Sequence, residues 1–337
     1  MINRCFGCCS SLGLIANSTR LVLLVALAVA FNLHAAQWKI DDGANTKAPG
    51  RRVEIREDGR LIAEFIYGSG QFKPYLHVFG ENEELLTNSG LGSDGKPTGQ
   101  FPHHRGIFIG WKINSDLGTD DLWHMTKNCK MEVQKVKTGT SAAPAEGAAN
   151  LEANILWRAA KKDDSGSDLL LTETRTLAIS RPHPKETMID ATFLLNPARD
   201  ISLVGDLQHS GVHFRASNEV ATRAKETSYL FEPDKIVKGN DMKWVRLLFP
   251  VGDRWYTAME MNAPSNPVEE LSMRDYGRFG YFFKRKLKKA EALTLKYRFV
   301  IEQVDDPADK PNPSTDQLTN SRAHCQQLFK QFVDTLR

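Results

Sequence analysis

The stretch FPHHRGIFIGW, residues 101–111, places two histidines and an arginine directly before a run that is typical of a buried β-strand. His103, His104 and Arg105 are costly to bury unless each finds a partner. The two glycines of the run weaken a strand unless something must approach its backbone closely. Either a structural polar cluster or a binding site would account for this combination.

A strand that starts near residue 103 would divide these side chains between two faces. His104 and Phe108 fall on one face together with both glycines, which leaves a shallow concavity with a histidine at its rim. Arg105 and Trp111 fall on the other face with two isoleucines, and that composition is typical of a protein core.

The segment GDLQHSGVHFR, residues 205–215, repeats this arrangement, because His209, His213 and Arg215 alternate with apolar residues. If both strands lie in one sheet with these faces aligned, the histidines of the two segments converge. Imidazole suits proton transfer, since its unperturbed pKa lies near neutrality. The alternative is that these histidines bond to loops and fill the interior of a sandwich.

Two further segments carry polar and aromatic side chains, DDLWHM and SMRDYGRFG. The first adds Asp121, Trp123 and His124 in an expected loop, and the second adds Arg274, Asp275, Tyr276 and Arg278 around a turn. Loops over a rigid scaffold often assemble binding sites. Packing of the loop and bracing of the turn by an Arg–Asp pair are the competing interpretations.

These side chains have two predicted roles. The expected acid and base groups are His104, His209, His213 and His124. Arginine would bind a carboxylate or stabilise developing negative charge, and flat aromatic rings would stack on a sugar. The expected ligand-binding residues are His103, Arg105, Trp111, Trp123, Arg215, Arg274, Asp275 and Tyr276.

The N-terminus has the pattern of a secretory signal peptide. Basic residues precede the apolar run LVLLVALAVAF, and small residues follow it, which predicts cleavage after Ala36. We therefore expect a secreted or periplasmic protein with no membrane span after cleavage, since the run is shorter than the ~20 residues that a span needs. Two cysteines remain after cleavage, Cys129 and Cys325, and their spacing leaves open whether they pair.

Composition and strand pattern predict an all-β fold. The chain has 337 residues, 41% hydrophobic, with a net charge of +3, and its basic residues are dispersed, so we expect no nucleic-acid partner. About a dozen strand-like segments follow Arg51, and only residues 316–337 have helical spacing. We predict a single large antiparallel β-sandwich over residues 37–337, ending in that helix. The stretch 138–150 reads as a long hairpin loop.

Several motifs, in this order, resemble one family of exported bacterial proteins: FKPYLHVFG, FPHHRGIFIGW with DDLWHM, HSGVHFR, and NAPSNP leading into RDYGRFG. That family carries the label "methane oxygenase PmoA", and the resemblance runs from about residue 51 to residue 303. It implies a β-sandwich enzyme or binding protein connected with carbohydrate chemistry. This chain departs from the family in two places: it has HSG where HGG is usual, and VEELSM replaces a proline-rich stretch.

Three functions fit these observations. The first is an exported carbohydrate-active enzyme of lyase, hydrolase or epimerase type; lyase or isomerase chemistry is favoured because no Asp/Glu pair suited to a glycosidase stands out. The second is a non-catalytic module that binds a glycan or another small molecule at the cell surface. The third is a metal site with imidazole ligands, although no local motif such as H-E-x-x-H supports a divalent ion. Methane oxidation is not expected, because the methane monooxygenase subunit of that name has several membrane spans.

Overall fold

The computed structural model describes residues 36–45, 50–68, 73–141, 147–237, 241–305 and 314–337. The predicted signal peptide therefore lies outside the described residues, apart from Ala36. Within these ranges, no helix combines the length and the apolar character that crossing a bilayer requires.

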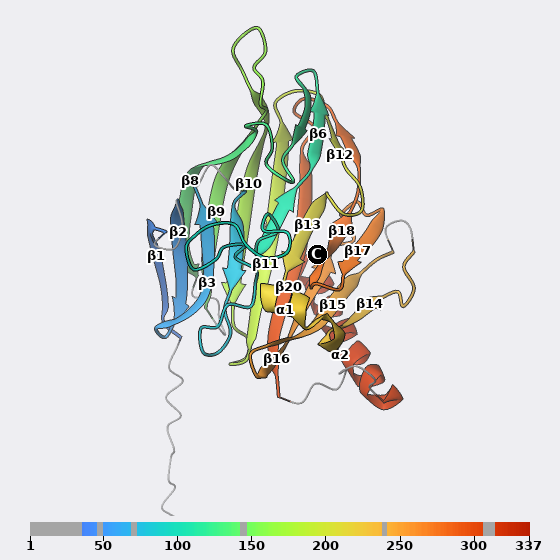
Figure 1. Ribbon diagram of the computed structural model, residues 1–337. Coiled ribbons are helices and arrows are strands. Elements are labelled where there is room, and N and C mark those ends of the chain that lie inside the picture. Colours follow the sequence, from blue (N-terminus) through green and yellow to red (C-terminus); the bar gives the residue numbers. More distant parts are fainter. Residues whose placement is uncertain (1–35, 46–49, 69–72, 142–146, 238–240, 306–313) are drawn as a thin grey trace, which may run out of the picture. The chain divides into compact units, whose positions relative to one another are not determined.

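The structure confirms the predicted all-β class, with three antiparallel sheets (Figure 1). The first, here called the site sheet, has eight strands in the order β1 (Trp38–Ala44), β2 (Arg51–Glu57), β3 (Arg60–Tyr67), β4 (Tyr75–Val78), β5 (Ile107–Gly110), β13 (Gly211–Arg215), β18 (Arg278–Phe282), β17 (Glu270–Arg274). The second, the back sheet, also has eight: β14 (Ser228–Glu232), β15 (Trp244–Val251), β16 (Arg254–Asn262), β20 (Leu293–Val304), β11 (Glu186–Pro197), β10 (Leu169–Ser180), β9 (Ala148–Arg158), β8 (Lys130–Ser141). The small sheet has four: β19 (Arg285–Leu287), β12 (Ile201–Val204), β6 (Lys112–Ser115), β7 (Gly118–Asp121).

The two large sheets enclose one apolar core, because their strands alternate as a two-sided sheet requires. In β20, Leu295, Tyr297, Phe299 and Ile301 all lie in this core, as their period-two spacing predicts. The hairpin between β2 and β3 also forms as expected, with Asp58 and its following glycine at positive φ in the turn.

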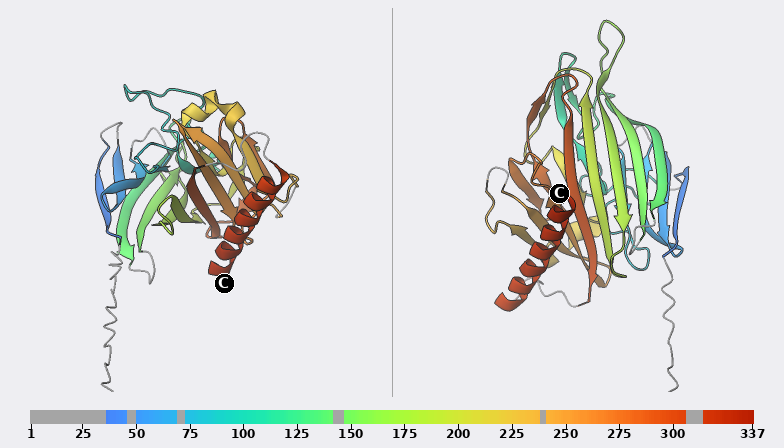
Figure 2. Two further views of the ribbon diagram at one scale, coloured as in Figure 1. Left: turned by 90° about the horizontal axis from the view of Figure 1, so that it is seen from below. Right: turned by 180° about the vertical axis from the view of Figure 1, so that it is seen from behind.

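Helix α2 (Thr315–Thr335) packs on the outer side of the back sheet, which Figure 2 shows from behind. It begins with a capping box in which Ser314 and Gln317 satisfy each other's backbone N–H groups. Phe332 and Cys325 are buried with apolar residues of β15 and β16. Cys129 and Cys325 are both buried and form no disulfide with each other.

Two expectations about segment boundaries are wrong. The predicted strand over residues 205–215 forms only from Gly211 onward, because Gly205 adopts a φ of 147° and a turn follows it. The preceding strand β12 joins the small sheet, whereas β13 joins the site sheet. The stretch 138–150 is only partly a loop, since β8 continues to Ser141 and β9 starts at Ala148. Short helices α1 (Asn218–Thr222) and η1 (Ala224–Glu226) follow β13.

The glycines of the opening motif admit close neighbours to β5. A Cβ on Gly110 would lie 2.9 Å from the carbonyl oxygen of Leu122, so the bare backbone lets the segment after β7 rest on the strand. Gly106 has a φ of 55°, and a Cβ there would lie 2.2 Å from the oxygen of Leu76. The loop between β4 and β5, cyan to teal in Figure 1, passes over the front of the same sheet.

Candidate active site

The histidines of the two distant segments meet around one indole, as the sequence predicts. The ring of Trp123 lies 5.3 Å from that of His104, 6.3 Å from that of His209 and 5.0 Å from that of His213, measured between centroids. The meeting follows from the pairing of β5 with β13, which sets His213 opposite Phe108. Trp123 comes from the segment that Gly110 admits.

Two more histidines complete the group. The ring of His124 lies 4.7 Å from that of His103 and 4.9 Å from that of His209. We call the five residues His103, His104, His124, His209 and His213 the histidine cluster. The side chains of His124 and His209 remain 29% and 30% exposed, so these two rings are open to a solute.

Each of the two exposed rings is held by a carboxylate three residues earlier. His124 donates from Nδ1 to Asp121 at 2.8 Å, and His209 donates from Nδ1 to Asp206 at 2.8 Å. Burial alone would raise the pKa of Asp121, but hydrogen bonds from His124 outweigh it and lower that pKa to about 2, so the carboxylate stays charged. Within the described residues no hydrogen bond engages Nε2 of either ring, which leaves that nitrogen for a ligand.

The two most buried rings support the site from beneath. His213 has no exposed surface; its Nε2 donates to the oxygen of Ser210 at 2.8 Å, and its Nδ1 accepts from Arg278 at 3.0 Å. Nε2 of His104 accepts from the indole N–H of Trp123 at 3.2 Å. Burial, reinforced by nearby positive charge, lowers the pKa of both imidazoles, so both rings are neutral.

Unpaired polar atoms accompany this arrangement. Nδ1 of His104 and Nε2 of His103 are both buried and have no hydrogen-bond partner among the described residues. Burial and the neighbouring Lys73 lower the pKa of His103 to about 3. A buried nitrogen without a partner costs free energy unless a ligand or water completes it.

Two arginines without exposed surface lie below the rings. Arg278 bonds to His213, to the hydroxyl of Tyr276 at 3.1 Å and to that of Ser272 at 3.3 Å. Arg215 donates to the backbone oxygens of Ala216 and Tyr276 and lies 4.8 Å from the Tyr276 ring. In the part of the chain that is described, neither guanidinium forms an ion pair with a carboxylate. An uncompensated buried charge is unfavourable for stability, so it favours an anion nearby.

Lys73 adds a third buried positive group. Its ammonium donates to the oxygens of Trp123 and His103, and it lies 4.8 Å from the centre of the Phe108 ring. Burial lowers its pKa to about 7, with the charge of Asp121 acting in the opposite direction. The group thus titrates in the physiological range directly beneath the imidazoles.

An aromatic rim borders the exposed rings. Phe101 is 41% exposed, lies 5.0 Å from the ring of Tyr276 and 5.5 Å from that of His104, and adopts a φ of 55°. That left-handed conformation is unfavourable for phenylalanine, and such strain is found preferentially at functional sites. The exposed face of Phe101 can stack on a ligand.

Several predicted roles need correction because of burial. Trp111 has no exposed surface and donates its N–H to Phe283 in the core between the sheets, so no ligand reaches it. Trp123 and Arg215 are equally buried, and Arg105 bonds to the oxygen of Pro102. These three side chains support the site rather than contact a ligand.

The remaining predicted residues lie at the border of the cluster. Arg274 is half-buried and donates to the oxygen of Met273, and its charge contributes to the lowered pKa of His213. Asp275 is exposed on the turn after it. Tyr276 lies between Phe101 and Arg215.

Sequence reasoning missed three residues of this site: Phe101, Lys73 and Asp206. Asp206 precedes His209 by three residues, and Asp121 precedes His124 by the same interval. That repeated D-x-x-H spacing was a usable signal for the paired carboxylates. Lys73 gave none, since a buried lysine is not visible in sequence.

No group of three or more histidine, cysteine or acidic side chains in the described ranges is arranged to hold a metal ion. The rings of His103, His124 and His209 are near neighbours, but proximity of rings is not convergence of nitrogen atoms.

Comparison with known proteins adds little about activity. No curated protein matches the chain. Among solved structures it is similar to a mutant of the heparan sulfate lyase HepC from Pedobacter heparinus, at a TM-score of 0.36, 10% identity, and coverage of 81% of this chain and 36% of that one. It is also similar to the alpha-galactosidase from Lactobacillus brevis, at a TM-score of 0.31, 11% identity, and coverage of 79% and 39%. The chain thus spans well under half of either structure, and at these scores the similarities carry no conclusion about function.

One family model covers most of the β-sandwich. It does not test the resemblance to the methane-oxygenase family, which stays a prediction. The model described as "Family of unknown function (DUF6807)" matches residues 52–310, and the chain belongs to this family.

Proposed function

We propose that the protein is an exported enzyme that transfers protons on a carbohydrate bearing a carboxylate, with His124 and His209 as the acid and base. One observation carries this proposal: two partly exposed imidazoles, each hydrogen-bonded to a carboxylate, have ring centroids 4.9 Å apart and lie above buried cations for which the described residues supply no carboxylate partner.

The arrangement suits removal of a proton from carbon next to a carboxylate. A neutral imidazole takes that proton at Nε2, and the electrons form a carbon–carbon double bond as the neighbouring C–O bond breaks. The second imidazole, protonated, gives its proton to the departing oxygen. The same pair would instead invert the carbon if the second ring returned a proton to the opposite face.

Positive charge below the rings supports an acidic substrate. Arg278 and Arg215 remain charged at neutral pH, although burial lowers the pKa of Arg215 to about 10. Electrostatic attraction in a partly buried site is stronger than in water. Negative charge that develops on the carboxylate during proton removal is stabilised from this side.

The carbohydrate class rests on other support. Phe101 offers a flat apolar face at the rim, of the kind that packs against a sugar ring. The resemblance to exported proteins from bacteria that degrade polysaccharides points the same way. The predicted signal peptide would bring the protein to such substrates outside the cytoplasm.

The test is a product screen with acidic and neutral polysaccharides. We expect the wild-type protein to release unsaturated or epimerised products from an acidic polysaccharide, and the double variant His124→Ala/His209→Ala to release none. His183→Ala, an exposed histidine on the far hairpin, serves as the control and should retain full activity. Retention of a glycan without any product from the wild-type protein would reject catalysis and favour a binding module.

A further inference from the structure

A cavity opens on the same face of the site sheet as the histidine cluster. It lies over β3 and β4 rather than over β5 and β13. Its volume is about 550 Å³, within the range of roughly 300–1,000 Å³ typical of small-ligand sites. We call it the Glu64 pocket. The residues that line it and carry the inference are Glu64, Tyr75, His77, Ser89, Leu91 and Asp94.

The floor of the Glu64 pocket is a carboxylate beside an imidazole. Glu64 and His77 lie directly opposite one another in the β3–β4 pair, and they are only 4% and 5% exposed. Nδ1 of His77 shares a hydrogen bond with the hydroxyl of Thr87 at 2.8 Å. Polar side chains buried this deeply at the base of a cavity mark a binding site more often than a surface indentation.

Charge separates this pocket from the histidine cluster. Among the described residues, its lining contains two carboxylates, from Glu64 and Asp94, and no lysine or arginine. Arg52, on the neighbouring strand β2, lies 3.4 Å from Glu64 and offsets its charge. The two carboxylates would repel a negatively charged ligand. A positively charged ligand would gain little from Glu64, because that carboxylate is already paired with Arg52. The pocket therefore suits a neutral ligand rich in hydroxyl groups.

The walls fit the same ligand. The ring of Tyr75 lies 4.9 Å from that of His77, and Leu91 contributes an apolar surface from the covering loop. Ser89 and Asp94 place oxygen atoms at the rim. Apolar walls with a few convergent polar groups are what a sugar ring requires, since it presents C–H faces and hydroxyl edges.

The pocket and the histidine cluster share a wall. Tyr75 belongs to the small apolar cluster that also contains Phe108 and Trp123, the rings beneath the histidines. The covering loop touches the opening motif, since a Cβ on Gly90 would lie 2.9 Å from Nε of Arg105. A ligand in the pocket thus lies against Tyr75, which packs with the aromatic rings that support the histidine cluster.

We infer that the Glu64 pocket binds a neutral sugar unit, beside the acidic unit that the histidine cluster is proposed to process. This inference rests on the proposed function for the carbohydrate class of the ligand. The hydrogen bonds that Glu64 and His77 make to its hydroxyls hold the sugar, and Leu91 covers it.

Calorimetric or NMR titration of the full chain with galactose, N-acetylglucosamine and glucuronate tests the inference. At least one neutral sugar should bind the wild-type protein, and Glu64→Gln should weaken that binding about tenfold, since a charged hydrogen bond is lost. Glu132→Gln on β8 is the matched control, because Glu132 also pairs with an arginine, Arg158, at 2.8 Å. It should leave binding unchanged.

Two additional variants keep the outcome decisive. Leu91→Trp fills the pocket from a half-buried loop position, so it should abolish neutral-sugar binding even if Glu64→Gln fails to fold. The double variant His124→Ala/His209→Ala should still bind the neutral sugar, which separates this inference from the proposed catalysis. Failure of all neutral sugars to bind the wild-type protein, or unchanged binding in Leu91→Trp, would overturn the inference.

Discussion

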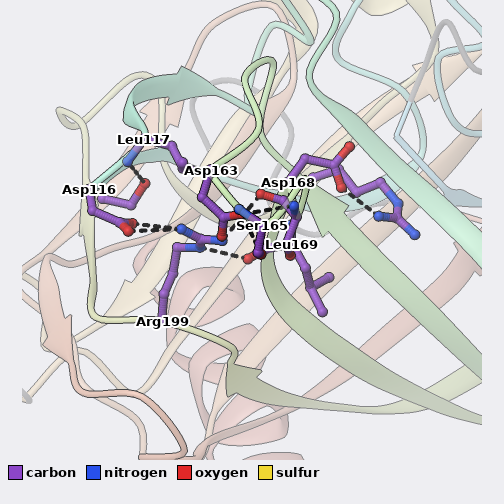
Figure 3. A network of polar contacts seen from close by, with 10 residues as sticks. Asp116, Leu117, Asp163, Ser165, Asp168, Leu169 and Arg199 are labelled. Atoms are coloured by element: carbon purple, nitrogen blue, oxygen red, sulfur yellow. Dashed lines mark hydrogen bonds and ion pairs between the residues drawn. The ribbon is translucent and has the colours of Figure 1, made fainter.

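Two polar regions of this protein differ in how the charge of an arginine is balanced. Figure 3 shows the first, the Arg199 network, in which Arg199 bonds to Asp116 at 2.8 Å, to Asp163 at 2.9 Å and to the oxygen of Leu169 at 2.8 Å. Asp163 in turn accepts from Ser165 and from a backbone N–H in the β9–β10 hairpin. Every charge there has an opposite charge beside it.

The histidine cluster has no such balance. Among the described residues, Arg278 bonds to neutral groups only, and two nearby imidazole nitrogens are buried without a hydrogen-bond partner. Both regions connect segments that are distant in sequence. A role in holding such segments together therefore does not explain why charge is balanced in one region and not in the other. In the Arg199 network the protein's own side chains satisfy the charged groups. The histidine cluster instead combines buried positive charge with unpaired nitrogens, which is the pattern of a ligand-binding site.

The largest expected effect is a loss of activity on substitution in the histidine cluster. His124→Ala and His209→Ala should each lower kcat/KM about 10²- to 10⁴-fold, the usual contribution of a positioned acid or base. Their melting temperatures should stay near that of the wild-type protein, because both rings are partly exposed. Kinetics and thermal unfolding on the same samples check this; an active variant of either kind would contradict the assignment.

A smaller loss should follow from Asp206→Asn. The ring of His209 remains, but the carboxylate that orients it and stabilises its charged form is gone, so we expect about a 10²-fold decrease in kcat at most. Asp316→Asn, in the first turn of helix α2, is the control. If Asp206→Asn were as active as this control, the paired carboxylates would have no role in proton transfer.

The third prediction concerns the Arg199 network, where substitution should change stability and not activity. Arg199→Met should lower the free energy of unfolding by about 2 kcal/mol, since several charge-assisted hydrogen bonds are lost at once. Its kcat/KM should equal that of the wild-type protein. Chemical denaturation gives the first quantity, and a reduced kcat/KM at unchanged substrate affinity would show that the two regions are not independent.

The smallest effect concerns pH. The pKa of His213 in the folded protein lies well below the 6.5 of a free imidazole, because burial disfavours its charged form. As pH falls below 6.5 the unfolded chain takes up a proton that the native state refuses, so stability is lost on acidification. His213→Gln removes this group but keeps a donor and an acceptor. Its melting temperature should therefore decline less steeply between pH 6.5 and 4 than that of the wild-type protein; equal slopes would contradict the lowered pKa.

The sequence predicted those parts of the fold that alternation and turn residues determine. The β2–β3 hairpin and the apolar face of β20 follow from local pattern alone. The third sheet could not be foreseen, because the break at Gly205 depends on a backbone conformation that the sequence permits but does not require.

The site was predictable in its histidines and not in its burial. Alternation along the two motifs predicted His104, His209 and His213 on one face. The pairing of β5 with β13 brings the two segments together, although His104 precedes β5 and His209 lies in the turn before β13. Which rings stay exposed depends on the loops that cover the sheet, and sequence pattern does not locate those. For that reason Trp111 was assigned to a ligand although it lies in the core, and Phe101 was passed over.

The most direct test of the proton-transfer role is chemical rescue. In His209→Ala, free imidazole added to the buffer should occupy the space of the missing ring and restore a substantial part of the lost turnover. The same addition should leave the wild-type rate unchanged. A folded His209→Ala protein that binds substrate but gains no activity over a wide range of imidazole concentration would contradict the account.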